Sequence, residues 1–347
     1  MDVIAFYLPQ YHVIPENEAI YGKGFTEWDN VRRARPLFPG HCQPHVPHPS
    51  IGYYSLLDER FLAMQHAMAF DFGVTGFCYY YYNFAGHRPL SRPLELIAAN
   101  RDICNKFCLC WPHGSWYNNR TTHREVFLPQ RYSPANAKIL FDDVRPYLEH
   151  PRHICIDGKP LLLIWAPERH PMLREYAEIW REQAHKAGFP GLWLAGVECY
   201  QGSPPSMFGL DGMVEFAPNW RPENHVSAPG EEPTRLDYIG TVRFMAQKEI
   251  PDYPRLRCTF PGWDNTPRRG RQGIACVNDS PELFQASLRF MLDYTQTVLP
   301  ASLHYVFINA WNEWGEGCHL EPDQQHGFKY VQIIQEELAR IARRPVI

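Results

Sequence analysis

The feature that most constrains the fold is an alternation that recurs eight times along the 347 residues, in which a short apolar run is followed by a longer, mostly helical stretch. Strands that alternate with helices are typical of a parallel sheet. Eight such units predict a (β/α)8 TIM barrel, because an open doubly wound sheet usually has fewer strands and a glycine-rich phosphate turn. The predicted strands are Val3–Pro9, Val74–Tyr82, Phe107–Trp111, Leu161–Ala166, Leu192–Glu198, Gly212–Phe216, Leu256–Pro261 and Tyr305–Ala310.

Helix ends can be recognised between these strands. Asp58 and Ser280 are expected N-caps, while Gly73 and Gly188 are expected stops. Barrels tolerate long strand-to-helix loops, so residues 1–347 are expected to form one catalytic domain with its active site at those loops. The predicted helices are Asp58–Phe72, Ser133–Leu148, Pro171–Ala187, Pro281–Val298 and Gly327–Arg343, and the long loops are Gln10–Leu57, Pro112–Tyr132, Tyr200–Leu210, Pro218–Leu236 and Gly262–Asp279.

Charge and hydropathy narrow the classes of partner. The formal net charge is −4, with 34 Lys and Arg against 38 Asp and Glu, so nucleic acid is not expected. No run is long enough to span a membrane, and residues 1–9 suggest a strand without a signal peptide. The ten cysteines lie mostly in apolar runs, which favours free thiols and a cytoplasmic location. Aromatic residues at 14% suit the flat faces of sugars.

The sharpest chemical signal is the segment Trp311-Asn312-Glu313-Trp314-Gly315-Glu316-Gly317 after the eighth predicted strand. Two carboxylates three residues apart converge if the chain turns there, and retaining glycosidases hold their carboxyl groups about 5 Å apart. We expect this pair to be catalytic, with the pKa of Glu316 raised by burial and Glu313 kept ionised by amide or Arg contacts. The alternative is that both residues simply begin the last helix.

Other polar and aromatic residues follow predicted strands at the same face of the barrel. Asp264 and its neighbours could bind sugar hydroxyls, or form a simple turn beside the Arg268-Arg269 pair. In the run Tyr79–Tyr82, alternate rings should point into the barrel and toward the helices. The complete predicted substrate-binding set is Tyr7, Gln10, His12, Glu27, Trp28, Tyr80, Tyr81, Trp111, His113, Trp263, Asp264, Asn265, Trp311, Asn312 and Trp314.

A metal or cofactor is not expected. The loop residues His41, His45 and His48 resemble a ligand cluster, but their spacing is interrupted by prolines and matches no known metal motif. The sequence also lacks a glycine-rich phosphate cradle. We therefore predict that the chain acts on an oligosaccharide or polysaccharide substrate.

Four segments together resemble WbsX-type polysaccharide-biosynthesis proteins, which are often called glycosyltransferases and are similar to glycoside hydrolase family 99, the endo-α-mannosidases. The resemblance runs from the first predicted strand to the last helix. The segments that carry it are Tyr7-Leu8-Pro9-Gln10-Tyr11-His12, Gly24-Phe25-Thr26-Glu27-Trp28, Trp263-Asp264-Asn265-Thr266 and Asn309-Ala310-Trp311-Asn312-Glu313-Trp314.

The resemblance implies a metal-free retaining site in a (β/α)8 barrel. By position, Glu313 would deprotonate the sugar 2-hydroxyl, which attacks C1 to give a 1,2-anhydro sugar, and Glu316 would protonate the leaving oxygen. That route requires a sugar of α-manno or α-rhamno configuration. The expected substrate is a surface polysaccharide that contains such residues. The chain differs from the family at His113-Gly114, where Asn-Glu is usual, which implies that one substrate-contacting carboxylate is missing.

Two other functions remain open from the sequence. One is a glycosyltransferase that uses a sugar nucleotide, which would need a diphosphate site. The other is a catalytically silent glycan-binding module that keeps the aromatic cleft.

Overall fold

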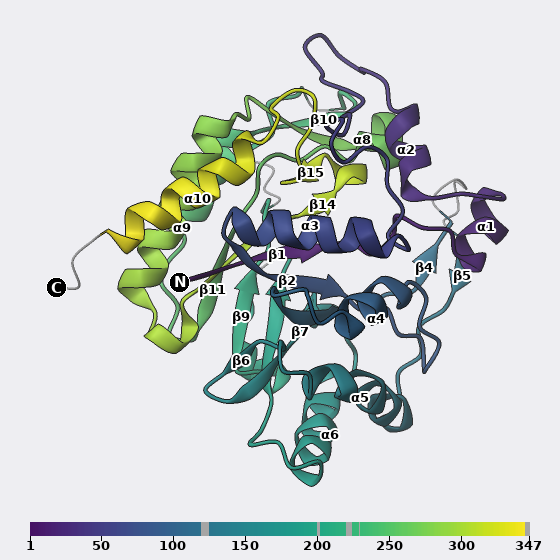
Figure 1. Ribbon diagram of the computed structural model, residues 1–347, viewed down its shortest axis with the longest axis vertical. Coiled ribbons are helices and arrows are strands. Elements are labelled where there is room, and N and C mark those ends of the chain that lie inside the picture. The colour runs from purple at the N-terminus through teal and green to yellow at the C-terminus, as the bar shows by residue number, and fades with distance from the viewer. Residues whose placement is uncertain (119–124, 200–201, 220–223, 229, 344–347) are drawn as a thin grey trace.

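The computed structural model describes residues 1–347 except 119–124, 200–201, 220–223, 229 and 344–347. Its centre is a closed barrel of eight parallel strands within the described residues, in which the third and fourth barrel strands pair to complete the circle (Figure 1). The predicted (β/α)8 fold is confirmed. The barrel strands are β1 (Asp2–Tyr7), β2 (Val74–Tyr80), β3 (Lys106–Trp111), β7 (Lys159–Trp165), β8 (Trp193–Glu198), β9 (Gly212–Glu215), β11 (Arg255–Thr259) and β13 (Tyr305–Ile308).

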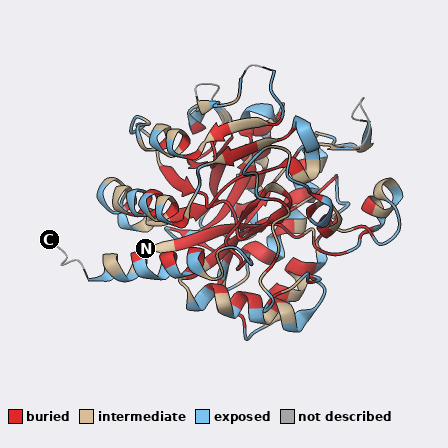
Figure 2. Cartoon of the chain, turned by 90° about the horizontal axis from the view of Figure 1, so that it is seen from above, coloured by how far each residue is buried: buried red, intermediate tan, exposed pale blue. Residues whose placement is uncertain are grey.

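Helices pack around the outside of the barrel and bury its outer surface. Figure 2 shows the buried strands enclosed by helices whose outward faces are exposed. The caps predicted at Asp58 and Ser280 are present, since each side chain accepts a hydrogen bond from the first turn of its helix. The helices are α1 (Pro15–Tyr21), α2 (Glu27–Arg33), α3 (Glu59–Asp71), α4 (Arg92–Ala99), α5 (Pro134–Leu148), α6 (Leu173–Lys186), α7 (Tyr238–Ala246), α8 (Thr266–Arg269), α9 (Pro281–Val298) and α10 (Lys329–Ala342).

The helix layer is irregular after β8. There the described residues hold only a 3-10 turn, Pro205–Phe208, before β9 begins.

A buried ion-pair chain lies at the ends of β8 and β9, where Lys248 contacts Glu198 at 2.9 Å and Glu215 at 2.8 Å. Arg257 pairs with the other Glu215 oxygen at 3.0 Å. Each of these buried charges therefore has an opposite charge beside it, as buried charges require.

Small strand pairs in the long loops build the rim of the barrel. The loops after β9 and β11 pair as a two-stranded parallel sheet. The short helix α8 lies in the second of these loops and contacts α2 and the turn at residues 314–316. The loop after β13 folds back on itself as a narrow antiparallel hairpin. These strands are β4 (Trp116–Tyr117), β5 (Val126–Leu128), β10 (Thr234–Asp237), β12 (Ile274–Val277), β14 (Asn312–Glu313) and β15 (Cys318–His319). A further short strand, β6 (Cys155–Ile156), pairs antiparallel with the start of β7.

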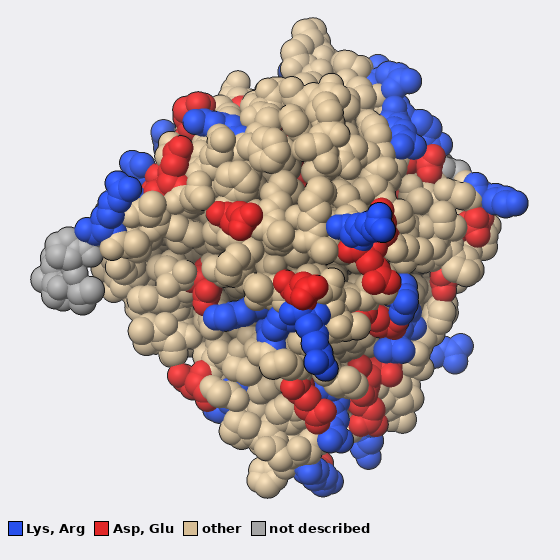
Figure 3. Space-filling view, in the orientation of Figure 1, with Lys and Arg blue, Asp and Glu red and all other residues tan. Residues whose placement is uncertain are grey.

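The distribution of surface charge and the state of the cysteines agree with what the composition predicts. On the face seen in Figure 3, Lys and Arg are interspersed with Asp and Glu. All ten cysteines are free thiols, and Cys78, Cys108 and Cys110 are buried in the barrel wall. Among the described residues, no helix has the length and apolar character needed to cross a membrane.

Candidate active site

Glu313 and Glu316 lie in the hairpin that follows β13, on the carboxyl-terminal face of the barrel. Glu313 ends β14, and residues 314–316 form a single 3-10 turn. Gly317 then takes a left-handed conformation, with φ 58°, and leads into β15. The last helix begins only at Lys329. The alternative that the two glutamates start that helix is therefore excluded.

One guanidinium holds the two carboxylates together with a third. Arg268 of α8 contacts Glu313 through Nη2 at 2.7 Å and Glu316 through Nη1 at 2.9 Å. Its Nε donates to Glu27 of α2 at 2.6 Å. The Arg268 side chain is only 20% exposed, so it is not part of a surface turn. Three carboxylates around a single cation leave an excess of negative charge that favours retention of a proton in the cluster.

Gly315 leaves the space into which this cluster packs. A Cβ at that position would collide with the Glu27 carboxylate and lie 2.8 Å from Nε of Arg268. The absence of a side chain at Gly315, between Trp314 and Glu316, therefore allows α2 and α8 to pack directly against the turn.

Backbone and side-chain hydrogen bonds fix the hairpin against the first barrel strand. The Asn312 amide accepts from the Leu8 N–H at 2.7 Å and donates to the Leu8 carbonyl at 3.0 Å, as a neighbouring strand would. The Trp314 N–H donates to the Tyr11 hydroxyl at 3.0 Å. The Trp314 indole stacks on His319 with ring centroids 3.6 Å apart. Asn312 and Trp314 therefore orient the two glutamates from behind.

A buried carboxylate that the sequence analysis missed lies beneath this turn. Glu321 accepts hydrogen bonds from Trp314 Nε1 at 2.6 Å, the Tyr54 hydroxyl at 2.7 Å and Gln65 Nε2 at 2.6 Å. The Tyr7 hydroxyl in turn donates to Gln65 at 2.6 Å. Burial raises the pKa of Glu321 to about 7, although all three donors favour its ionised form. Glu321 thus fixes the position of the Trp314 ring through charge and hydrogen bonding.

We expect Glu321→Gln to destabilise the protein in a pH-dependent way. The folded pKa of about 7 lies above the ordinary value of 4.5, so the native state binds the proton more tightly than the unfolded chain. The contribution of Glu321 to stability is then greatest below pH 4.5 and falls, by about 3 kcal/mol, as the pH rises to 7. Urea unfolding of both proteins at pH 5 and 7.5 should show the wild-type advantage shrinking. A pH-independent difference would contradict this assignment.

The two glutamates border a cavity of about 570 Å³ at the mouth of the barrel. Its walls combine rings with polar groups. Tyr80 and Tyr82 point inward, while Tyr79 and Tyr81 point to the helices, as the predicted alternation requires. Gln10 donates to the Tyr82 hydroxyl at 3.1 Å. The other lining residues include Trp165, Phe216, Trp263, Asn265, Arg269 and Asn309.

A second cavity of about 320 Å³ adjoins the first. Glu316, Arg268 and Gln10 line both cavities, whereas Glu313 lines only the larger one. Glu27 borders the smaller cavity. The remaining wall is largely aromatic and contains Tyr21, Phe25, Trp116, Tyr117 and Phe127. Glu316 therefore lies at the junction of a continuous two-part cleft.

The pKa values of both glutamates are raised, which differs from the expectation that only Glu316 would be shifted. Burial raises the pKa of Glu313 well above its ordinary value, while Arg268 opposes the shift. Burial also raises the pKa of Glu316, again against Arg268. The Glu313 side chain is 7% exposed and that of Glu316 is 24% exposed, so the deeper carboxyl is the more strongly shifted. The two carboxyls contact one guanidinium, so the retained proton belongs to the pair.

Comparison with known proteins identifies the family. Residues 3–334 match the family described as "Glycosyltransferase WbsX". The chain belongs to the WbsX family. It is 35% and 34% identical, over 345 residues, to the WxcX proteins of two strains of Xanthomonas campestris pv. campestris. The match covers 97% of this chain and 50% of each WxcX protein, so the chain spans about half the length of these relatives.

Solved structures share the fold of this WbsX chain at low sequence identity. The family GH99 endo-α-mannosidase from Bacteroides thetaiotaomicron superposes with a TM-score of 0.62 and 16% identity, covering 98% of this chain and 97% of that one. The same enzyme in complex with bis-tris propane gives 0.64 and 14%, with coverage of 98% and 97%. A "glycoside hydrolase-like protein" gives 0.61 and 13%, with coverage of 97% and 93%. These likenesses establish a shared (β/α)8 barrel fold.

Several residues predicted to bind substrate lie outside the lining of both cavities. Trp28 donates through Nε1 to the Tyr54 carbonyl and packs on Trp314. His113 stands at the position where the resemblance to WbsX proteins implies Asn. Its ring lies within hydrogen-bonding distance of the Ala166 carbonyl and the Tyr132 hydroxyl. Burial and packing account for these positions. The residues so placed are Tyr7, His12, Trp28, Tyr81, Trp111, His113, Asp264, Trp311, Asn312 and Trp314.

The histidine loop is not assembled as one ligand set. His41 contacts Asp264 at 2.6 Å, His45 contacts His319 at 3.0 Å, and His48 contacts Ser50. Within the described ranges, no group of three or more His, Cys, Asp or Glu side chains is arranged to hold a metal ion. Asp264 is thereby directed away from the cleft, and it also accepts from the Thr266 N–H at 2.9 Å.

Proposed function

We propose that this chain is a retaining glycoside hydrolase or transglycosylase for α-linked mannose- or rhamnose-like residues of a polysaccharide, with Glu313 and Glu316 as its catalytic pair. The observation that carries the proposal is the cluster of buried carboxylates around Arg268 at the mouth of an aromatic cleft. Sugar rings present apolar C–H faces and a rim of hydroxyls, which suit walls that combine aromatic rings with amides. Wider family membership and the shared barrel support the same conclusion.

The shape of the cleft supports the assignment of roles. A general acid must reach the oxygen between the cleaved sugar and the leaving group, and Glu316 lies where the two cavities meet. Glu313 borders only the larger cavity, where the cleaved sugar would sit. The smaller aromatic cavity would then hold the leaving group. The roles of acid and base are assigned from position alone. The pKa values of both carboxyls are raised, so their direction does not distinguish the acid from the base.

The reaction balances with these two groups alone. Ionised Glu313 takes the proton of the 2-hydroxyl, O2 attacks C1, and the bond from C1 to the leaving oxygen breaks as that oxygen takes the proton of Glu316. A 1,2-anhydro sugar results. In the second step ionised Glu316 takes a proton from water, the water oxygen attacks C1, and O2 leaves with the proton held by Glu313. Water is replaced by an acceptor hydroxyl in a transglycosylation.

The shared proton also serves this chemistry. One glutamate must start protonated and the other ionised, and three carboxylates around Arg268 favour a state with one proton held in the cluster. In each half-reaction one carboxyl gives a proton to the leaving oxygen and the other takes one from the attacking hydroxyl. The total charge of the pair is therefore unchanged when the anhydro sugar forms. Arg268 contacts both carboxylates and can stabilise either arrangement.

A panel of oligosaccharides tests the proposal. We expect α-mannosyl or α-rhamnosyl oligosaccharides to be cleaved or extended without any sugar nucleotide, and turnover to survive EDTA. Products are followed by mass spectrometry, with matched β-linked sugars as controls. Turnover that appears only when a sugar nucleotide is added would instead support a transferase, and binding of α-linked sugars without turnover would support a silent binding module.

A further inference from the structure

Asp264, in the loop after β11, is a buried carboxylate that the proposed reaction does not use. Its side chain is 8% exposed. Oδ2 accepts from His41 Nε2 at 2.6 Å and from Gln43 Nε2 at 2.5 Å, and Oδ1 accepts from the Thr266 N–H at 2.9 Å. Burial alone would raise the pKa of Asp264, but these hydrogen bonds hold it below its ordinary value. The carboxylate is therefore ionised and held in one orientation.

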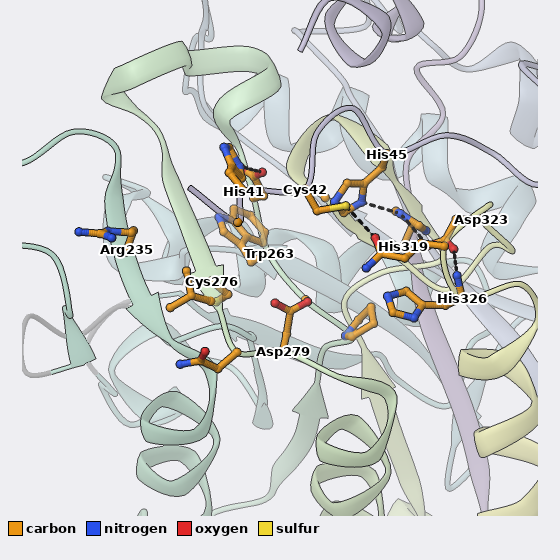
Figure 4. Close-up of a pocket in the computed structure, with 18 of the residues that line it drawn as sticks. His41, Cys42, His45, Arg235, Trp263, Cys276, Asp279, His319, Asp323 and His326 are labelled. Atoms are coloured by element: carbon orange, nitrogen blue, oxygen red, sulfur yellow. Dashed lines mark hydrogen bonds and ion pairs between the residues drawn. The ribbon is translucent and has the colours of Figure 1, made fainter. Parts of the chain in front are cut away.

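The His41 ring is fixed as a donor to this carboxylate. The Leu37 N–H donates to Nδ1 of His41 at 3.0 Å. A ring nitrogen that accepts a hydrogen bond carries no proton, so Nε2 carries the proton and donates it to Asp264. The ring also stacks on Phe38, with centroids 4.3 Å apart. Figure 4 shows His41 and Trp263, the residue before Asp264, in the wall of a neighbouring cavity of about 490 Å³.

The main chain of Asp264 contacts the turn that carries Glu316. The Asp264 N–H donates to the Glu316 carbonyl at 2.6 Å. Gly317 packs on the same residue, because a Cβ at Gly317 would lie 2.9 Å from the Asp264 Cβ and 3.0 Å from its nitrogen. The loop after β11 and the turn after β13 therefore meet at Asp264 without a side chain between them.

Asp264 is also connected to the cation that binds the Glu316 carboxylate. Thr266, whose N–H it accepts, is the first residue of α8, and Arg268 lies in the same short helix. Arg268 contacts Glu316 at 2.9 Å. The Glu316 carbonyl is thus bound by Asp264 directly, and the Glu316 carboxylate is connected to Asp264 through α8. A displaced Asp264 would shift both ends of this glutamate.

We propose that Asp264 is a positioning residue for the general acid, held in place by His41 and Gln43, and that it keeps the Glu316 carboxyl at the junction of the two cavities. Asp264 lines neither cavity of the cleft, so it would act on a bound sugar only through Glu316. This inference rests on the proposed function, because it takes Glu316 as the acid.

Asp264→Asn tests the proposal, because it keeps the shape of the side chain but turns an NH₂ group toward a donor in either orientation. We expect kcat/KM for α-mannosyl oligosaccharides to fall about 10- to 100-fold, and for activated aryl α-mannosides less than about threefold, since only the former need strong protonation. A general loss of folded protein would lower both values alike. Asp71→Asn, on the exposed end of α3, is the matched control and should change neither.

Two variants of His41 disturb the fold less and provide a second test. His41→Phe keeps a ring against Phe38 but removes the donor to Asp264. His41→Gln keeps an amide N–H donor at the end of the side chain. We expect His41→Phe to show the same contrast between substrates at a smaller size, and His41→Gln to recover most of the loss. Equal losses on both substrate classes in Asp264→Asn and His41→Phe would overturn the proposal.

Hydrogen exchange at the backbone amide of Asp264 needs no substrate, and it separates this inference from the catalytic proposal. The bond to the Glu316 carbonyl should protect this amide. We expect exchange about fivefold faster or more in His41→Phe, and unchanged in Asp71→Asn, when both are followed by NMR. Unchanged exchange in His41→Phe would also overturn the proposal. If the wild type cleaves no α-mannoside, the proposed function fails, while the exchange result still decides whether Asp264 and His41 hold the turn.

Discussion

Replacing Glu316 with Gln is expected to slow the cleavage of natural α-mannosides by about 10²- to 10⁴-fold, the usual range for loss of a general acid. Activated aryl α-mannosides, whose leaving groups need little protonation, should lose less than about tenfold. Replacing Glu313 with Gln should slow both substrates alike, by about 10³-fold, because deprotonation of the 2-hydroxyl is needed whatever the leaving group.

Steady-state kcat/KM values for the two substrate classes measure this contrast. Glu175→Gln, on the exposed first turn of α6, is the control and should change neither value. Equal losses on both substrates for Glu316→Gln would show that Glu316 is not the acid. A larger leaving-group dependence for Glu313→Gln would reverse the two roles.

The second large effect is expected at Arg268. Arg268→Met leaves Glu27, Glu313 and Glu316 without their shared cation, and breaking a buried ion pair on one side typically costs about 3–5 kcal/mol. The guanidinium lowers the pKa of Glu313, so its removal raises that pKa further. The base is then protonated over a wider pH range, and the acid limb of kcat/KM moves to higher pH.

Urea unfolding and a pH profile test these two consequences together. Arg268→Lys keeps one charge but cannot present three donors in a fixed fork, so it should recover part of the stability and little of the activity. Arg271→Met, on an exposed 3-10 turn nearby, is the matched control. An unchanged acid limb in Arg268→Met would show that the guanidinium does not set the ionisation of the pair.

The strands of the barrel could be predicted closely because each is a short apolar run with defined ends. All eight were placed, and helix boundaries such as Asp58 and Ser280 carried local capping signals. The long loop predicted at Tyr200–Leu210, after β8, agrees with the described residues there, which hold only the 3-10 turn Pro205–Phe208.

The catalytic candidates could be located because both glutamates lie within one short segment after β13. Their partner Arg268 could not be paired with them, since 45 residues separate Arg268 from Glu313 and no local pattern links the two. Glu321 was missed for the same reason, because its donors Tyr54 and Gln65 lie 267 and 256 residues away. Contacts of this range depend on how the barrel closes, which the local sequence does not specify.

The sequence predicted only in part which aromatic residues line the cleft. Tyr80 and Tyr81 are adjacent in sequence, but the alternation along β2 sends Tyr80 into the cavity and Tyr81 against α5. The aromatic residues Trp28 and Trp311 were expected in the cleft because of their type, and instead they pack behind it. Residue type indicated the class of ligand, and the fold decided which rings reach it.

The most direct test of the central claim is to compare an aryl α-mannoside with its 2-deoxy analogue. The account requires the 2-hydroxyl as the internal nucleophile, with Glu313 as its base. The 2-deoxy compound should therefore bind in the cleft, act as a competitive inhibitor, and show no enzyme-dependent release of the aryl group above the rate seen with Glu313→Gln. Efficient cleavage of the 2-deoxy compound by the wild-type protein would contradict the anhydro-sugar route and make Glu313 an ordinary nucleophile.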